Sequence, residues 1–274
     1  MIRVVIITYD KFSVDIDLTY IPASENRNAD LQNIRSALER IKERLSRQKP
    51  ALRFSDPVRA NEELKLICET PDAMIKMEVN QINRGIIGET ETLFLCDKAQ
   101  EIFDQFCEIK TVSQKQLWGG KINAALDRQH PRDLFDVRNL IDEIGFTTEI
   151  KEGFIFFLLC GKRPIHELLR PHPVDQAAVF ESQFKGMTDK SFSYEEYEST
   201  RELLIKTINE SLTKEDKEFL LAFSNGEPDW SRVDYSKYPA IRWKFLNICK
   251  LKESNPLKHE EQVEVLRQML FRHK

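Results

Sequence analysis

Hydrophobic and polar residues alternate along the first part of the chain with the period of a half-buried strand. Between Val14 and Ile21, the residues at even positions are apolar, and Asp15, Asp17 and Thr19 stand between them. Because successive side chains of a strand point to opposite faces, this pattern predicts a strand with one apolar and one acidic face. Further strands are predicted over residues 64–69, 73–80 and 106–111.

Elsewhere the period changes to that of a helix. Apolar residues three and four positions apart predict an amphipathic helix from Asp30 to Arg47, which Pro50 ends. A short helix is expected around residues 99–103. From Ser113 onward the strand pattern fades, and helices are expected over residues 121–128, 132–144, 148–159, 194–211, 214–223, 240–250 and 260–272.

This order of elements predicts an α+β protein with two parts. Residues 1–112 are expected to form a small α/β lobe around a mixed sheet, and residues 113–274 a larger helical lobe. The 274 residues are enough for two such domains, each with its own core. With 41% hydrophobic and 31% charged residues, the composition is that of a folded globular protein rather than a disordered one.

Charge and cysteine usage exclude several classes of protein. The formal net charge of −4 is not that of a basic nucleic-acid-binding protein, although residues 236–274 hold nine Lys and Arg against four Glu. That stretch is expected either to guide an RNA backbone or to be an ordinary solvated helical face. The five cysteines form no C-x-x-C pair and lie in apolar stretches, which predicts buried reduced thiols. No H-x-x-x-H spacing supports a zinc site.

No segment has the pattern of a membrane span or of a secretion signal. The longest apolar run, from Phe154 to Cys160, is far shorter than the roughly 20 residues that a bilayer requires. The apolar residues 1–7 are followed by Thr8, Tyr9 and Asp10 rather than by a cleavage site of small residues. The sequence therefore predicts a cytoplasmic protein.

Three acidic residues on two predicted strands are the first candidates for chemistry. Asp15 and Asp17, two positions apart, project from the same face, and a cation between them relieves their mutual repulsion. Oxygen ligands of this kind suit Mg²⁺. Glu78 on a separate strand can add a third carboxylate, and Lys76 on the same face can lie near a phosphate. The alternatives are a polar strand face and a surface Lys–Glu pair.

Charged residues also cluster between Gly119 and Asp136. Lys121 and Arg128 are seven positions apart and share one face of a helix. Pro131 can open a second helix at its first position, which places Asp133 in the positive first turn. Arg132 and Asp136 are then four apart. The structural alternatives are a first-turn stabiliser, an ordinary ion pair and a solvated lysine.

The motifs together resemble the signature of the AbiEii/AbiGii nucleotidyltransferases, which are toxins of abortive-infection and toxin–antitoxin pairs. That family has S-x-D-I-D-L-T, I-K-x-E, K-x-x-A-x-x-x-R and R-D-x-[FY]-D segments in this order. The resemblance covers about residues 12–140. The matching residues are Ser13 to Thr19, Ile75 to Glu78, Lys121, Ala124 and Arg128, and Arg132 to Asp136.

The resemblance implies a fold like that of DNA polymerase β and a metal-dependent transfer of a nucleotide. Asp15 and Asp17 would hold Mg²⁺ on a nucleoside triphosphate, and Glu78 would be the third carboxylate beside the acceptor hydroxyl. Lys121 would contact the phosphates, and Asp136 would shape the rear of the site. The resemblance also places Ser13, Lys76, Arg128, Arg132 and Asp133 at the nucleotide.

The family also implies partners. An RNA acceptor, often the 3′ end of tRNA, or a protein acceptor is expected, together with a cognate antitoxin protein. The family opens its first motif with a G-[GS]-[ST] turn, whereas residues 3–11 here contain no glycine. A β-branched run does not readily adopt the positive φ angles of such a turn. We expect either a missing upstream segment or a degenerate motif, with weaker nucleotide binding in both cases.

Three hypotheses therefore stand at this point. The first is a nucleotidyltransferase toxin. The second is a non-catalytic protein of the same fold that binds nucleotide, RNA or an antitoxin. The third is an α+β scaffold whose carboxylates are surface features.

Overall fold

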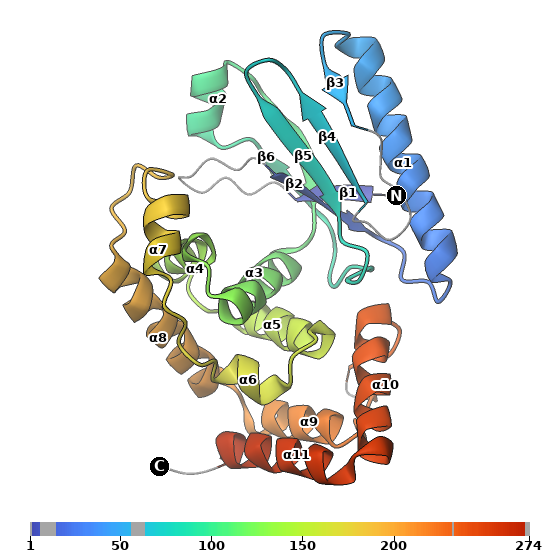
Figure 1. Ribbon diagram of the computed structural model, residues 1–274, viewed down its shortest axis with the longest axis vertical. Helices are drawn as coiled ribbons and strands as arrows, with labels where there is room; N and C mark the ends of the chain where they lie inside the picture. The colour runs from blue at the N-terminus through green and yellow to red at the C-terminus, as the bar shows by residue number, and fades with distance from the viewer. Residues whose placement is uncertain (1, 6–14, 56–63, 232, 272–274) are drawn as a thin grey trace. The chain divides into compact units, whose positions relative to one another are not determined.

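The computed structural model describes residues 2–5, 15–55, 64–231 and 233–271. These residues divide into two compact units, Met1–Ser113 and Gln114–Lys274 (Figure 1). Ser13 lies outside the described residues, as does most of the glycine-free stretch that precedes it. The first unit is built on a sheet and the second on helices, so the predicted α+β class is confirmed.

A five-stranded mixed sheet forms the first unit. Its strands lie in the order β1-β2-β5-β4-β3. β2 and β5 are parallel, and the other neighbouring strands are antiparallel. The parallel pair lies inside the sheet, where each strand has a neighbour on both sides. The strands span Ile2–Val5 (β1), Asp15–Tyr20 (β2), Arg53–Phe54 (β3), Lys65–Glu69 (β4) and Met74–Val79 (β5).

One face of this sheet is apolar and packs against helix α1 (Arg27–Gln48). Ile34 and Leu38 of α1 are fully buried among side chains of β2, β4 and β5. The helix begins after Asn26, whose side chain accepts a hydrogen bond from the backbone of Ala29 and so satisfies one of the free N–H groups of the first turn. The helix thus starts earlier than the periodicity predicted, because the cap is polar and lies outside the apolar pattern.

A smaller hairpin completes the unit. β6 (Glu91–Phe94) and β7 (Glu108–Thr111) are antiparallel and are joined through the short helix α2 (Asp97–Phe103). α2 and β7 were expected, whereas β6 was not. Its four residues include only two apolar ones, and Phe94 is exposed, so the strand shows no clear alternation.

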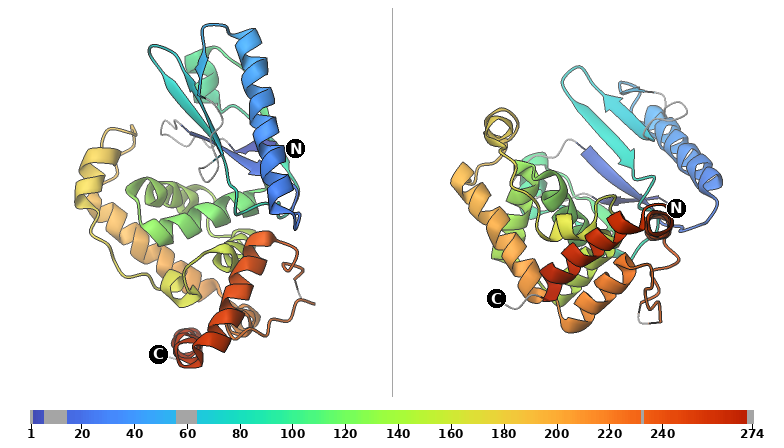
Figure 2. Two further views of the ribbon diagram at one scale, coloured as in Figure 1. Left: turned by 45° about the vertical axis from the view of Figure 1, so that its right-hand side comes forward. Right: turned by 60° about the horizontal axis from the view of Figure 1, so that its bottom comes forward.

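Helices form the second unit, and α3 and α5 run side by side at its centre (Figure 2). The close packing depends on glycine: a Cβ atom on Gly153 would lie 1.9 Å from the backbone oxygen of Lys115, and one on Gly119 would lie 2.3 Å from the backbone of Gly153. The helices span Gln114–Arg128 (α3), Pro131–Glu143 (α4), Thr148–Cys160 (α5), Ile165–Leu169 (α6), Ala177–Val179 (α7), Phe180–Phe184 (η1), Tyr194–Ser211 (α8), Lys214–Ser224 (α9), Pro239–Ser254 (α10) and Pro256–Phe271 (α11).

Two further expectations can be compared with this fold. The prediction that the cysteines are buried holds for Cys160 but is wrong for Cys96 and Cys107, which are exposed beside α2. Their apolar neighbours belong to a hairpin that is itself largely exposed, so local hydrophobicity was a poor guide to burial. In the described part of the chain, no helix has the length and apolarity that crossing a bilayer requires.

Candidate functional site

The carboxylates predicted in the first unit lie on one face of its sheet. The register of the parallel strands β2 and β5 places Asp15 opposite Lys76 and Asp17 opposite Glu78. Residues paired in this way project to the same side of a sheet, and the apolar residues between them face α1. The acidic face is therefore the face that α1 does not cover, and it brings together residues from two distant segments of the chain.

The ammonium group of Lys76 lies between two of these carboxylates. Its Nζ atom is 3.1 Å from Oε1 of Glu78 and 3.6 Å from Oδ1 of Asp15. The three side chains are about one-third exposed, with 31%, 28% and 37% of their surfaces accessible. The hydrogen bond to Glu78 raises the pKa of Lys76, against a smaller effect of burial, and the charge of Asp15 raises it further. Lys76 is thus held in its charged form.

The residues on this face fit a divalent cation by the chemistry of their donor atoms. Asp15, Asp17 and Glu78 supply carboxylate oxygens, which Mg²⁺ prefers. The cationic Nζ of Lys76 already lies against two of the three, so the face carries a positive charge where the carboxylates approach each other. Among the described residues, no three acidic, histidine or cysteine side chains converge as a ready ligand set. Lys76 would therefore compete with a metal ion for the oxygens of Asp15 and Glu78.

Two ion pairs join α3 to α4 in the second unit. Nζ of Lys121 lies 2.5 Å from Oδ2 of Asp136, a carboxylate that is only 3% exposed. Arg128, at the end of α3, donates from Nε and Nη2 to the two oxygens of Asp133 at 2.5 and 2.8 Å. This two-pronged geometry is the stronger form of an arginine–carboxylate contact. Asp133 occupies the first turn of α4, as expected.

His130 begins helix α4 and contributes a cap. Its Nδ1 atom accepts a hydrogen bond from the backbone N–H of Arg132 at 3.2 Å, and Nε2 lies 3.3 Å from Oε1 of Gln183. A neutral ring with its proton on Nε2 satisfies both contacts. Burial lowers the pKa of His130, which keeps the ring in this neutral form. The start of α4, and with it Asp133, is fixed by this arrangement.

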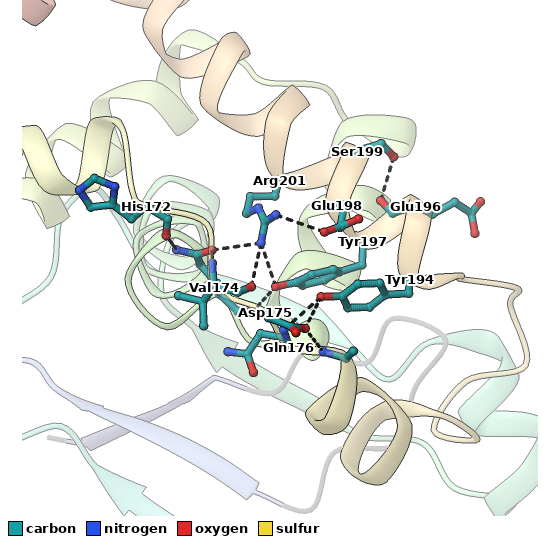
Figure 3. A network of polar contacts seen from close by, with 12 residues as sticks. His172, Val174, Asp175, Gln176, Tyr194, Glu196, Tyr197, Glu198, Ser199 and Arg201 are labelled. Carbon is teal, nitrogen blue, oxygen red and sulfur yellow. Dashed lines mark hydrogen bonds and ion pairs between the residues drawn. The ribbon is translucent and has the colours of Figure 1, made fainter.

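The connection between α3 and α4 is also held from α8, whose Tyr197 and Arg201 bind Gln129. Figure 3 shows Tyr197 and Arg201 on this helix, with Arg201 hydrogen-bonded to Val174. Gln129 is buried and has a positive φ of 50°, which is uncommon for a residue other than glycine. The hydroxyl of Tyr197 donates to its backbone oxygen at 2.8 Å. The guanidinium of Arg201 donates to its side-chain oxygen at 3.2 Å and to the backbone oxygen of Val174 at 3.1 Å.

The same network extends to the segment before α7. The Gln129 amide donates to the backbone oxygen of His172 at 2.7 Å, and Gln176 donates to the backbone oxygen of Arg128 at 3.1 Å. Sequence reasoning missed Gln129, Tyr197 and Arg201. The four-residue spacing of the last two on a predicted helix was visible, but nothing in it pointed to Gln129.

The comparisons with known proteins agree on the kind of fold. The model of the family "Nucleotidyl transferase AbiEii toxin, Type IV TA system" matches residues 9–247. Among solved structures, the chain is similar to MenT4, a nucleotidyltransferase toxin from Mycobacterium tuberculosis H37Rv, with 12% sequence identity and a TM-score of 0.52. The likeness covers 93% of this chain and 78% of that chain, and it confirms a nucleotidyltransferase fold. No curated protein matches the sequence.

Proposed function

Because the chain belongs to the AbiEii family of nucleotidyltransferase toxins, we propose that it transfers a nucleoside monophosphate from a nucleoside triphosphate to RNA with the help of Mg²⁺. The observation that carries this proposal is the register of β2 and β5, which gathers Asp15, Asp17 and Glu78 on one face of the sheet. An RNA end offers the hydroxyl that such a reaction needs. A protein hydroxyl is the alternative acceptor.

The reaction is an in-line displacement at the α-phosphorus. The oxygen of the acceptor hydroxyl attacks, the bond to the β-phosphate oxygen breaks, and pyrophosphate leaves. Glu78 accepts the proton of the acceptor hydroxyl. Asp15 and Asp17 would hold Mg²⁺, which neutralises the phosphates when it is bound. The ammonium group of Lys76 lies 3.1 Å from Oε1 of Glu78 and so orients this carboxylate.

The family motifs in the second unit lead us to propose Lys121, Arg128 and Arg132 as contacts of the phosphates. Asp136 is buried and fixes the ammonium of Lys121, so the lysine is oriented before a phosphate arrives. Arg128 is fixed in the same way by Asp133, whose position depends on the start of α4. Arg132 lies in that first turn and adds a third cation. Ser13 is proposed as a nucleotide contact from the motif alone.

A second function is favoured by two specific observations. Residues 3–11 contain no glycine, and the ammonium of Lys76 already neutralises two of the carboxylates. Both features suit a protein that binds nucleotide, RNA or an antitoxin without transferring anything.

One experiment separates the candidates. Each nucleoside triphosphate, labelled at the α-phosphate, is incubated with the protein, Mg²⁺ and total tRNA, and label in RNA is measured. Transfer by the wild type but not by Asp15→Asn supports the enzyme. Calorimetric binding of a nucleotide without transfer supports the binding protein. If the protein neither binds nor transfers any nucleotide, only the hypothesis of an α+β scaffold with surface carboxylates remains.

The cellular setting follows from the same proposal. Nucleoside triphosphates and tRNA are substrates of the cytoplasm, so we propose that the protein acts there. Its family implies a type IV toxin–antitoxin pair, and we propose a cognate antitoxin. Induction of the wild-type chain should slow growth, whereas Asp15→Asn should not. Co-expression of a cognate antitoxin should restore growth.

A further inference from the structure

Three arginines form a stripe along the C-terminal half of α1. Arg40, Arg44 and Arg47 are four and three positions apart, which places them on one face of the helix. All three are exposed. Together with Glu43 and Gln48 they line a shallow hollow of about 370 Å³. We call Arg40, Arg44 and Arg47 the arginine stripe.

The stripe is poorly neutralised by the protein itself. Within the described part of the chain, Arg40 and Arg44 contact no carboxylate. Arg47 lies 3.7 Å from Glu43, but these side chains are 81% and 66% exposed, and such a pair contributes little. Residues 35–53 hold seven Lys and Arg against two Glu, although the whole chain has a net charge of −4. The positive charge is therefore concentrated at this place.

The fold does not need these charges. α1 is anchored through the opposite side of the helix, where Ile34 and Leu38 are buried against the sheet. Arginines of like charge four residues apart repel each other, so the stripe slightly destabilises the helix that carries it. An anionic partner reverses that cost. The planar guanidinium group matches the oxygens of a phosphate better than an ammonium group does.

We propose that the arginine stripe binds the phosphate backbone of the RNA acceptor. The helix rises about 1.5 Å per residue, so Arg40 and Arg47 are roughly 10 Å apart along its axis and can face two or three successive phosphates. The inference rests on the proposed function for the identity of the acceptor. It names a surface that the family motifs do not include.

The basic C-terminal stretch is a weaker candidate for the same role. Lys244 is buried and donates to two backbone oxygens. Lys252 pairs with Glu227, and Arg267 pairs with Glu264. These cations already have partners within the chain, which the excess of charge in the sequence did not reveal.

The test compares two variants with the same change in charge. In the stripe variant, Arg40, Arg44 and Arg47 are all replaced by Gln. In the control, Lys185, Lys206 and Lys214 are replaced by Gln; each of these pairs with a glutamate on its own helical segment. Binding of labelled total tRNA is measured from 50 to 200 mM salt, without nucleotide or metal. Thermal melting checks that both variants are folded.

The stripe variant should bind tRNA at least 10-fold more weakly at 100 mM salt than the wild type does. The slope of log K against log salt should fall by about 2–3, since each neutralised phosphate contributes about 0.9. The control should bind within twofold of the wild type. Equal weakening of both variants, unchanged binding of the stripe variant, or no tRNA binding by the wild type would overturn the proposal.

The same assay separates this inference from the proposed function. Asp15→Asn should bind tRNA like the wild type while transferring no nucleotide. If the stripe variant loses binding but no protein transfers nucleotide, the RNA surface stands and the proposed transfer fails. If the wild type transfers nucleotide to tRNA and the stripe variant binds it normally, the transfer stands and the RNA surface fails.

Discussion

Asp17 and Glu78 stand directly opposite each other on the parallel strands β2 and β5, although a helix, two strands and their connections separate them in the chain. The backbone register fixes this relationship, so it does not depend on the rotamers of the two side chains. Asp15 extends the same face by one step along β2. Any ligand that approaches this face meets carboxylates from both strands at once, which is the physical basis of the proposed transfer.

The first prediction concerns Glu78 as the proton acceptor. Glu78→Gln keeps the shape of the side chain but removes its basicity, so kcat for nucleotide transfer should fall roughly 100-fold or more, with little change in KM for the triphosphate. Steady-state rates with labelled nucleotide measure this. Glu69→Gln, at an exposed position of β4, is the matched control and should leave kcat unchanged. A kcat loss that is equal in both variants would contradict the assigned role.

The second prediction concerns the ammonium group of Lys76. Because its Nζ atom lies against Glu78 and Asp15, it competes with any divalent cation for these oxygens. Lys76→Met should therefore bind Mn²⁺, a stand-in for Mg²⁺, several-fold more tightly than the wild type. Titration followed by the signal of free Mn²⁺ in electron paramagnetic resonance measures the affinity. Weaker Mn²⁺ binding by Lys76→Met would contradict this prediction, because it would show that Lys76 helps the carboxylates to bind the cation instead of competing with it.

Much of the acidic face was predictable from the sequence, because a two-residue period decides which side chains share a face. Asp15 and Asp17 alternate with Ile16 and Leu18. As the pattern required, the two aspartates lie on one face of β2 and the two apolar residues lie on the other. The pairing of β2 with β5 was not predictable from periodicity. Strands find their neighbours through tertiary packing, and only the resemblance to a family linked Glu78 to the aspartates.

The second unit shows where local patterns were insufficient. Helix α3 begins at Gln114, whereas the helix predicted from the sequence began only at Lys121, after Gly119 and Gly120. Paired glycines normally weaken a helix, but here the packing of α5 against α3 outweighs that tendency. The Gln129 network was hidden for a related reason. Its members, Gln129 and Arg201, come from distant segments, and a positive φ at glutamine leaves no mark in the sequence.

The third prediction concerns the packing of α3 against α5. A Cβ on Gly153 would lie 1.9 Å from the Lys115 backbone oxygen, so Gly153→Ala should push the helices apart and cost about 3 kcal/mol or more of unfolding free energy. In Gly120→Ala, the new atom would lie 3.3 Å from a side-chain atom of Phe157, which can adjust. This control should be nearly neutral. Urea denaturation measures both, and equal effects would rule out the close backbone approach.

The fourth prediction concerns the hydroxyl groups of two tyrosines on α8. The Tyr197 hydroxyl is buried and donates to Gln129, so Tyr197→Phe leaves that backbone oxygen without a donor and should cost about 1–3 kcal/mol of stability. The neighbouring Tyr194 is partly exposed, and water can replace its hydroxyl contacts. Tyr194→Phe should therefore cost under about 1 kcal/mol. Urea denaturation of both variants gives the comparison.

The Tyr197 variant also tests whether the corner between α3 and α4 positions Arg128. If it does, Tyr197→Phe should raise KM for the triphosphate more than it lowers kcat, while Tyr194→Phe changes neither. If Tyr197→Phe is destabilised but its KM for the triphosphate is unchanged, the hydrogen bonds around Gln129 stabilise the fold without positioning Arg128.

The last prediction concerns the pH dependence of stability at Lys244. Its Nζ atom donates to the backbone oxygens of Leu158 and Arg163 near the end of α5, at 2.7 and 2.8 Å. Burial lowers its pKa from 10.5 to about 8. Above pH 8 the folded protein loses this proton while the unfolded chain keeps it, so the unfolded state binds more protons and stability rises with pH. The expected gain between pH 7 and 9 is about 1 kcal/mol.

Urea denaturation at both pH values measures this gain, and Lys244→Met supplies the reference. Burial raises the pKa of the Cys160 thiol, which acts in the opposite direction as pH approaches 9, but the thiol is present in both proteins. The quantity to compare is therefore the pH-dependent change of the wild type minus that of the variant. It should be positive. A zero or negative difference would mean that Lys244 keeps an ordinary pKa, with its ammonium group solvated rather than buried against α5.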